Sequence, residues 1–401
     1  MCWKLSSKRG NILLNLMISG LVPKIVITFI CYDCIFHQIK SCYKNSRKIK
    51  SVINLYKVNF FFRKELEFSS VLDNQNILIT GGTGSFGHQM VKELKNYNPK
   101  KIVIYSRDED KQHQMKQEFY ENHNEIFQKM KFIIGDVRDY DRLYTATKDI
   151  DIVFHAAALK QVPTVELHPF EAVKTNIIGP YNVVKAAVAR NVKKVIAIST
   201  DKASKPVNAM GMTKALQEKI MLSEDLEKDE TTFCCVRYGN VLGSRGSVIP
   251  LWDRKIQNNQ SLPITHPEMT RFMLTLSQAI QLVFYALKNS KGGEIFVKKS
   301  PAANIVDLAK AYAELITKNN NYPIEFIGIR SGEKIDEVLI SQEEMRHTKD
   351  EEGHFVIEKE LDFDNRYLEK SINLPEYTSS STKNLTIEEL KKLMSNLDWV
   401  Q

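Results

Sequence analysis

The stretch Asn76-Ile-Leu-Ile-Thr-Gly-Gly-Thr-Gly-Ser-Phe-Gly87 joins a short apolar run to a glycine-rich turn. Residues 77–79 have the length and character of a buried strand, and glycines at 82, 84 and 87 follow with the spacing G-x-G-x-x-G. The next segment predicts a helix, because Phe86, Met90 and Leu94 recur on one face. This order is typical of a turn that holds a pyrophosphate, although an ordinary strand-to-helix turn also uses glycine.

Further apolar runs follow this turn and alternate with polar or helical segments. Strands and helices that alternate at this spacing predict an α/β fold with a doubly wound parallel sheet, the Rossmann arrangement. Ligands of such sheets bind beyond the carboxyl ends of the strands, so we expect the site at that edge. The predicted strands are residues 102–105, 132–134, 152–154, 195–198 and 233–236, and a long helix is expected over residues 169–190.

The end of the second strand predicts the type of cofactor. An acidic residue there would bind the ribose hydroxyls of NAD, but the chain offers Ser106 and Arg107, with Lys111 nearby. A cation suits a 2′-phosphate, so the pattern favours NADP over NAD; the alternative is that Arg107 merely faces solvent. The cofactor-binding residues predicted from the turn and the strand ends are Gly81, Gly84, Ser85, Phe86, Gly87, Ser106, Arg107, Asp136, Val137, Ala156, Ala157, Ala158 and Tyr238.

The basic character of the chain belongs to its first part. The net charge is +8, but residues 1–72 carry twelve Lys or Arg and three acidic residues, which leaves about −1 for the remainder. The globular part therefore has no electrostatic argument for binding nucleic acid. We divide the chain into a basic extension (residues 1–72), an NADP-binding domain (73–240) and a smaller substrate-binding lobe (241–401) interleaved with it.

The extension contains a broken apolar segment at residues 11–36 and four cysteines, Cys2, Cys31, Cys34 and Cys42. Asn15, Pro23, Lys24 and Asp33 interrupt the segment, which otherwise approaches the length of a membrane span. We favour a dispensable extension, with weak membrane association as the alternative. A zinc site at the cysteines is weaker than the simpler interpretation that they are small apolar residues. Cysteine usage predicts a reduced, cytoplasmic protein.

A catalytic stretch follows the fifth strand. It runs Ser199-Thr-Asp-Lys-Ala203 and continues into a helix on which Met210 and Lys214 lie one turn apart. With the glycine turn, this helix resembles the extended short-chain dehydrogenase/reductase enzymes that modify nucleotide sugars. Most members of that family carry a tyrosine base where this chain has Met210, which cannot transfer a proton.

The methionine and several other motifs narrow the resemblance to the bacterial capsule and O-antigen CapD/CapE group. The resemblance runs from about residue 76 to the C-terminus. It implies an inverting UDP-N-acetylglucosamine 4,6-dehydratase, and some members of the group are named UDP-glucose 4-epimerases. The motifs are Ala156-Ala-Ala-Leu-Lys-Gln-Val-Pro163, Ser199-Thr-Asp-Lys-Ala203, Arg237-Tyr-Gly-Asn-Val241, Ser244-Arg-Gly-Ser-Val-Ile-Pro250, Met269-Thr-Arg-Phe272 and Arg330-x-Gly-Glu-Lys334.

The resemblance also implies roles for the residues of the catalytic stretch. Asp201 is expected to act as the acid for the departing C6 hydroxyl, and Lys202 as the base for the C5 proton. Burial and the nearby Lys214 are expected to lower the pKa of Lys202. Lys214 is expected to hold the nicotinamide ribose, and Thr200 to bind the C4 hydroxyl. With Met210 in place, the group that takes the proton of that hydroxyl is left open.

The substrate-binding candidates lie in the family motifs and in two asparagines. Guanidinium groups pair well with phosphate oxygens, so three arginines are candidates for the UDP diphosphate. The full set is Lys160, Asn176, Asn240, Arg245, Arg271, Arg330 and Glu333. The alternatives to dehydration are a 4-epimerase, which needs no C5 base, and a cofactor-binding scaffold that has lost catalysis. We also expect a homo-oligomer.

Overall fold

The computed structural model describes residues 3–8, 11–16, 67–223, 230–244, 246–359 and 374–395. The chain divides into two compact units, Met1–Leu66 and Glu67–Gln401. In the first, β1 (Trp3–Lys8) pairs antiparallel with β2 (Asn11–Leu16). The predicted apolar segment from residue 17 onward, and the four cysteines of the extension, lie outside the described residues. Across the described ranges, no helix combines the length and the apolar character that crossing a bilayer requires.

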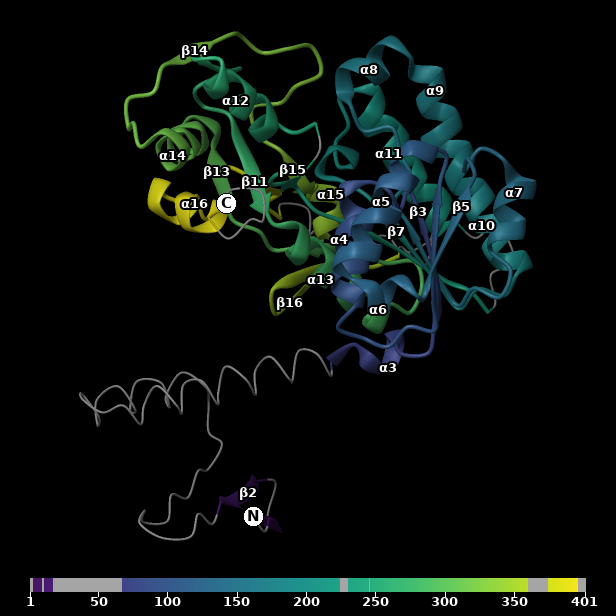
Figure 1. The fold of residues 1–401 in the computed structure, drawn as a ribbon. Helices are drawn as coiled ribbons and strands as arrows, with labels where there is room; N and C mark the ends of the chain where they lie inside the picture. The colour runs from purple at the N-terminus through teal and green to yellow at the C-terminus, as the bar shows by residue number, and fades with distance from the viewer. Residues whose placement is uncertain are drawn as a thin grey trace. The chain divides into compact units, whose positions relative to one another are not determined.

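The second unit is built on a nine-stranded sheet that confirms the predicted doubly wound fold (Figure 1). Seven neighbouring strands are parallel, and two antiparallel strands extend the sheet at one edge. The order across the sheet is β16 (Thr348–Glu351), β17 (His354–Ile357), β12 (Ile295–Lys298), β8 (Thr232–Arg237), β7 (Lys194–Ile198), β6 (Ile152–His155), β3 (Asn76–Thr80), β4 (Lys101–Ser106) and β5 (Met130–Ile134).

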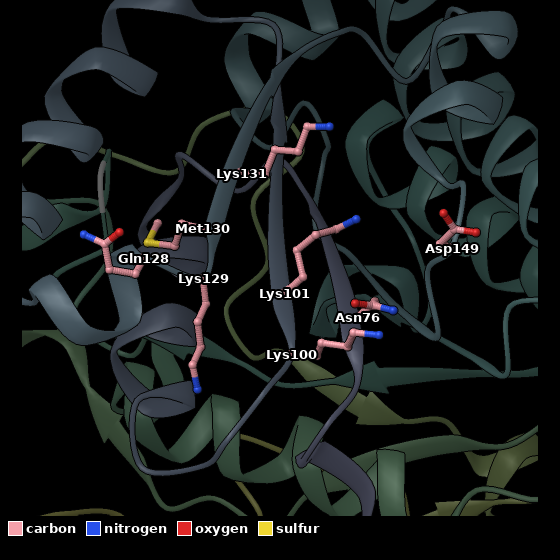
Figure 2. A pocket seen from close by; sticks show the side chains of 8 residues that line it. All are labelled: Asn76, Lys100, Lys101, Gln128, Lys129, Met130, Lys131 and Asp149. Carbon is pink, nitrogen blue, oxygen red and sulfur yellow. The ribbon is translucent and has the colours of Figure 1, made fainter.

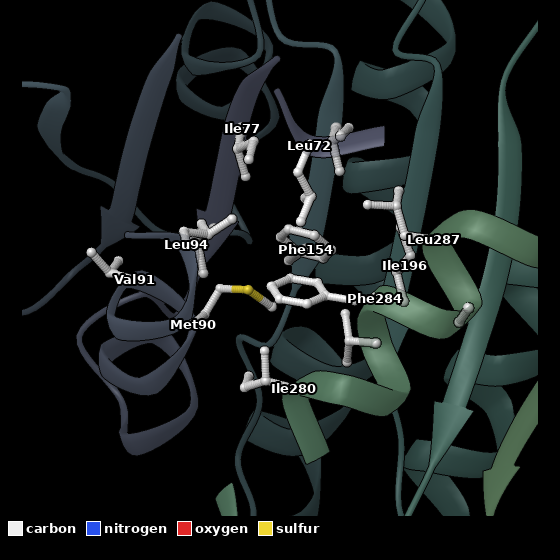
Figure 3. Close-up of a cluster of buried hydrophobic side chains, with 14 of the residues drawn as sticks. Leu72, Ile77, Met90, Val91, Leu94, Phe154, Ile196, Ile280, Phe284 and Leu287 are labelled. Atoms are coloured by element: carbon white, nitrogen blue, oxygen red, sulfur yellow. The ribbon is translucent and has the colours of Figure 1, made fainter. Parts of the chain in front are cut away.

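Helices cover both faces of the sheet because its central strands are apolar on both sides. On one face, Phe284 lies among Met90, Leu94 and Phe154 (Figure 3). The helices of this face are α4 (Ser85–Leu94), α5 (Glu109–Asn122) and α13 (Leu276–Asn289). The other face is covered by α7 (Tyr140–Ala146), α10 (Gly179–Ala189) and α11 (Ala209–Leu222).

Two details differ from the sequence prediction. The compact unit begins at Glu67 rather than at residue 73, because Phe68 and Leu72, beside α3 (Ser69–Leu72), are buried in the same core. The long helix expected over residues 169–190 consists of α9 (Pro169–Val173), a π-helical turn (Lys174–Ile178) and α10. The short helices α6 (Asn124–Phe127) and α8 (Val162–Leu167) complete this part.

Cys234 and Cys235 are free, buried thiols on β8. Cys234 packs in the core around Phe284, and Cys235 packs in the core on the opposite face. Adjacent residues of a strand point to opposite faces, so the two thiols do not form a disulfide.

A smaller lobe lies on the side of the sheet away from α7 and α10 (Figure 1). Its separate core contains Trp252 and Tyr312. Its helices are α12 (Val248–Gln257), α14 (Ile305–Thr317) and α16 (Ile387–Met394), and its small sheets contain β9 (Asn240–Val241), β10 (Leu262–Ile264), β11 (Thr270–Leu274), β13 (Ala302–Asn304) and β14 (Ile324–Phe326). Between lobe and sheet lie β15 (Val338–Ile340), α15 (Gln342–Met345) and β18 (Tyr377–Thr378).

Candidate active site

A cavity of about 660 Å³ lies at the carboxyl ends of the parallel strands, where the sequence predicted it. It runs from the glycine turn to the catalytic stretch. Most of the predicted site residues line it, and the parallel register explains why, since the strand ends meet at one edge. These residues are Gly81, Gly84, Ser85, Phe86, Ser106, Arg107, Asp136, Val137, Ala156, Ala157, Ala158, Lys160, Thr200, Asp201, Lys202, Met210, Lys214, Tyr238 and Asn240.

The glycine turn is shaped by close backbone contacts. Gly81 has a φ of +65°, and a Cβ on it would lie 2.8 Å from the backbone of Ala157. At Gly87, which the cavity does not reach, a Cβ would lie 2.0 Å from the carbonyl oxygen of Gly82. Gly84 occupies the N-cap of α4, so the positive end of this helix faces the cavity. The turn therefore forms a cradle suited to an anionic group, and side chains at these positions would fill that cradle.

The next two strand ends form the wall beside the turn. The hydroxyls of Thr83 and Ser106 lie 2.9 Å apart. Arg107 is exposed, and its Nη1 lies 3.6 Å from Asp136 Oδ2. Burial raises the pKa of Asp136, but hydrogen bonds from Arg138 outweigh it, so the net shift is downward. Asp136 is therefore an anion at neutral pH, held by cations on the cavity rim.

The end of β6 is fixed by a buried hydrogen bond. Thr80 Oγ1 and His155 Nδ1 lie 2.8 Å apart. Burial, with a smaller contribution from Lys214, lowers the pKa of His155 to about 3. A neutral His155 beside Thr80 therefore supports the backbone that leads into Ala156 and Ala157.

The catalytic stretch forms a charged pair on the cavity wall. Lys202 Nζ lies 3.1 Å from Asp201 Oδ1, and the Thr200 hydroxyl donates a hydrogen bond of 2.7 Å to the same oxygen. Asp201 is 1% exposed, whereas the Lys202 side chain is 22% exposed. The pair is thus covered by protein on one side and open to the cavity on the other.

A carboxylate that the sequence analysis missed completes this cluster. Glu337 Oε1 lies 3.1 Å from Lys202 Nζ, and Glu337 is 3% exposed. Burial lowers the pKa of Lys202, but Asp201 and Glu337 together outweigh burial and raise the pKa above its usual value. The expectation that the pKa of Lys202 is lowered was therefore wrong. No sequence pattern pointed to Glu337, because it approaches from a segment far along the chain.

Lys214, unlike Lys202, has a lowered pKa. Its Nζ donates to the carbonyl oxygen of Ile198 at 2.6 Å and to Gln217 Oε1 at 2.7 Å. Burial lowers the pKa of Lys214 to about 8. Met210, one turn earlier, is 4% exposed and packs against Val165. The two side chains share one helix face, as predicted, and both line the cavity.

Two predicted residues have structural contacts that occupy their polar groups. Asn176, on the π-helical turn, accepts from the backbone N–H of Leu159 at 2.8 Å and donates to its carbonyl oxygen at 2.9 Å. Arg271 is 8% exposed, and its guanidinium donates to backbone carbonyl oxygens at residues 270, 334 and 335 and lies 3.5 Å from Glu337 Oε1. Neither residue lines the cavity.

The remaining substrate candidates lie apart from the cavity or outside the described residues. Arg330 is exposed and pairs with Glu333, with 3.7 Å between Nη1 and Oε1. Arg245 lies outside the described residues.

A second hollow, of about 530 Å³, lies at the opposite edge of the sheet and is lined largely by lysines (Figure 2). It contains none of the predicted site residues.

The comparison with known proteins identifies the family. A family model described as polysaccharide biosynthesis protein matches residues 77–359. The chain belongs to the polysaccharide biosynthesis protein family. A UDP-glucose 4-epimerase from Rickettsia bellii (strain OSU 85-389) is 47% identical to this family member over 340 residues, which are 82% of this chain and 97% of the relative.

Solved structures agree with this family assignment and with the fold. The X-ray structure of Pen from Bacillus thuringiensis is 40% identical, covers 81% of this chain and 99% of its own, and has a TM-score of 0.74. The dTDP-glucose 4,6-dehydratase from Streptomyces venezuelae, solved with NAD bound, is 17% identical and has a TM-score of 0.57. That structure covers 65% of this chain and 86% of its own, and it supports the fold alone.

Proposed function

We propose that this chain is an NADP-dependent dehydratase that converts UDP-N-acetylglucosamine to a 4-keto-6-deoxy sugar nucleotide, with inversion at C5, for surface polysaccharide biosynthesis. The observation that carries the proposal is the Asp201–Lys202 pair on the cavity wall, with 3.1 Å between its charged atoms. Elimination of water from a sugar needs an acid and a base close together, and this pair supplies one of each.

The cavity fits a dinucleotide on its glycine side. The cradle at Gly81 and the start of α4 suit a pyrophosphate, and Lys214 at the far end suits a ribose. Arg107 on the rim supports NADP over NAD, because a guanidinium pairs with a 2′-phosphate. The bound cofactor would supply a hydride acceptor for C4 that later returns the hydride to C6.

The residues of the catalytic stretch can account for the proton transfers of the oxidation and elimination steps. Thr200 would accept the proton of the C4 hydroxyl and pass its own to Asp201, to which it already donates. Asp201 would then give that proton to the departing C6 hydroxyl, which leaves as water. Lys202, which is charged in the free site, would lose its proton to solvent through the open side of the cavity and then remove the C5 proton as a neutral amine. Inversion requires that C5 regain a proton on its opposite face, from a donor other than Lys202. Met210 needs no role in proton transfer in this scheme.

Substrate binding is assigned to residues around the charged side of the cavity. Lys160 and Asn240 line the cavity and can contact the sugar nucleotide. Lys160 is exposed, and partial desolvation by the cavity wall lowers its pKa. Arg245, Arg330 and Glu333 remain candidates from the resemblance alone. Asn176 and Arg271 would act by holding the backbone of the cavity wall.

A 4-epimerase is the second candidate function, and the names of the Rickettsia relatives favour it. An epimerase transfers a hydride at C4 but has no use for a base at C5, so the ionisable Lys202 favours dehydration. A cofactor-binding scaffold is the third candidate, and the intact cluster of Asp201, Lys202 and Lys214 argues against it.

The deciding experiment is a mass spectrum of UDP-N-acetylglucosamine after incubation with the protein and catalytic NADP. A product lighter by one water is the expected result. An unchanged mass with a changed sugar on chromatography would replace dehydration by epimerisation. No conversion, also with UDP-glucose, would favour the scaffold.

We also propose that the protein forms a homo-oligomer. Several large apolar side chains are exposed on α8 to α11, among them Leu167 at 77% and Phe170 at 67%. Exposed apolar groups in one region are typical of an interface between subunits. Light scattering coupled to size-exclusion chromatography should give a mass above that of the monomer, and a monomer mass would contradict the proposal.

A further inference from the structure

Glu337 is a buried carboxylate that reaches the catalytic pair from the lobe side of the cavity. It immediately precedes β15, which packs against the turn that carries Lys202. Its backbone N–H donates to Ser379 Oγ at 2.9 Å, and its carbonyl oxygen accepts from the backbone N–H of Ser379 at 2.9 Å. The backbone that carries the Glu337 side chain is therefore held in place.

The charges around Lys202 come from three segments of the chain. Asp201 belongs to the same 3₁₀ turn as Lys202 (Asp201–Ala203), Glu337 and Lys334 belong to the segment before β15, and Arg271 belongs to β11. Lys202 Nζ directly contacts the two carboxylates, whereas Lys334 Nζ donates to the carbonyl oxygen of Ser204. Arg271 lies on the far side of Glu337, at 3.5 Å from the oxygen that Lys202 contacts.

Each carboxylate of the cluster has one oxygen without a hydrogen bond among the described residues. Asp201 Oδ2 and Glu337 Oε2 are both buried and unpartnered. A buried acceptor without a donor costs free energy. The oxygens that do have partners, Asp201 Oδ1 and Glu337 Oε1, are the ones that contact Lys202 Nζ, so both carboxylates are directed at this amine.

We propose that Glu337 is a positioning residue for Lys202. From the lobe side, Glu337 directs the Lys202 amine toward the cavity and favours the charged form of that amine. The inference rests on the proposed role of Lys202 as the base at C5. Glu337 contacts neither substrate nor cofactor in this scheme. It favours the charged form of Lys202 before substrate arrives, and together with Asp201 it holds Nζ at 3.1 Å from each of two carboxylate oxygens.

The direction of the expected effect follows from the charges. An anion at 3.1 Å favours the ammonium form. Replacing Glu337 by glutamine keeps the shape and removes the charge, so the pKa of Lys202 should fall. Neutral Lys202 then exists at lower pH. The acid limb of the kcat/KM profile should move to lower pH by the same amount.

The test compares the full-length wild type, Glu337→Gln and the surface control Glu325→Gln. Acetic anhydride acetylates only neutral amines, so the rate of Lys202 acetylation at pH 8, read by peptide mass spectrometry, reports its neutral fraction. We expect an increase of about tenfold to hundredfold in Glu337→Gln, since each unit of pKa is a factor of ten. Glu325 is exposed on β14, and its variant should match wild type.

The labelling needs no turnover, so it separates this inference from the proposed function. Unchanged acetylation in a folded Glu337→Gln protein would overturn the role of Glu337. Increased acetylation in Glu337→Gln, together with no conversion of UDP-N-acetylglucosamine by wild type, would support Glu337 and refute the dehydratase. If near-ultraviolet circular dichroism shows that Glu337→Gln does not fold, Glu337→Asp replaces it. Its carboxylate is one methylene shorter, so a smaller increase supports the inference and no increase refutes it.

Discussion

The two halves of the cavity are built from different materials. The half beside the glycine turn is made of backbone and small side chains, with Gly81 pressed against Ala157. The half beside the lobe is made of buried charges, with Lys202 between Asp201 and Glu337. The shape of the backbone half does not depend on pH, whereas the charge distribution of the other half changes when one of its groups gains or loses a proton. The first half is therefore suited to binding and the second to proton transfer.

Removing the lysine of the charged half should have the largest effect on rate. Lys202→Ala is expected to lower turnover by about 10²–10⁴-fold, the range for a general base, and to leave NADP affinity unchanged. Steady-state kinetics and cofactor titration measure the two quantities. Lys310→Ala, at an exposed position of α14, is the control. Turnover that survives in Lys202→Ala would assign the base elsewhere.

The hydroxyl of Thr200 provides the next test of the charged half. Thr200→Val removes the hydrogen bond to Asp201 and should lower kcat by about tenfold to hundredfold, because the C4 proton loses its route. Thr200→Ser keeps the hydroxyl and should retain most of the activity. Equal rates for valine and serine would exclude a proton relay through this position.

Gly81→Ala tests the backbone half. The positive φ costs a non-glycine residue about 1–2 kcal/mol, and the added Cβ would also clash with Ala157. We expect NADP affinity to fall by about tenfold or more, measured by fluorescence titration. Gly328→Ala is the matched control, since Gly328 has a φ of +83° and nothing within 4 Å of the added Cβ. Equal NADP affinity in the two variants would show that the close approach at Gly81 is unimportant.

Lys214 lines the cavity between the two halves, and we expect it to strengthen NADP binding while lowering the free energy of unfolding. Burial lowers its pKa to about 8, so below pH 8 the folded protein holds a buried charge that the unfolded chain holds in water. Lys214→Met should weaken NADP binding and yet raise the free energy of unfolding at pH 7 by about 1–3 kcal/mol. This gain should shrink between pH 8 and 10.5, where folded wild type loses its proton first. Denaturant unfolding at pH 7 and 9.5 would show a constant difference if the charge were irrelevant.

The smallest effect on stability is expected outside both halves, at Arg330. Its exposed pair with Glu333 should contribute less than about 0.5 kcal/mol to the free energy of unfolding. If Arg330 holds the diphosphate, Arg330→Ala should raise KM for the UDP-sugar by about tenfold without changing NADP affinity. An unchanged KM would remove Arg330 from the substrate site.

The sequence predicted the sheet and its carboxyl edge because strand ends in a parallel sheet converge whatever the loops do. Ser106, Asp136 and Thr200 could each be placed there from the strand that precedes it. The same reasoning does not reach Arg271 or Glu337, whose surroundings are set by contacts between distant segments of the chain. The family motif that contains Arg271 suggested that this residue binds phosphate, and no motif suggested a role for Glu337.

The pKa of Lys202 could not be predicted for the same reason. Burial alone would lower it, and only the count of carboxylates around Nζ decides the sign. One of those carboxylates is adjacent in sequence and the other is not.

Arg237 has a mechanical consequence for the segment that carries Glu337. Its guanidinium donates to Glu218 of α11 at 2.6 and 2.7 Å and to Glu344 of α15 at 2.7 and 2.8 Å, and it is 3% exposed. Moving Glu218 or Glu344 away from Arg237 would leave an uncompensated buried charge. This end of the segment is therefore held firmly in place. If the segment bends, we expect the bend at its other end, where a Cβ added to Gly328 would meet nothing within 4 Å.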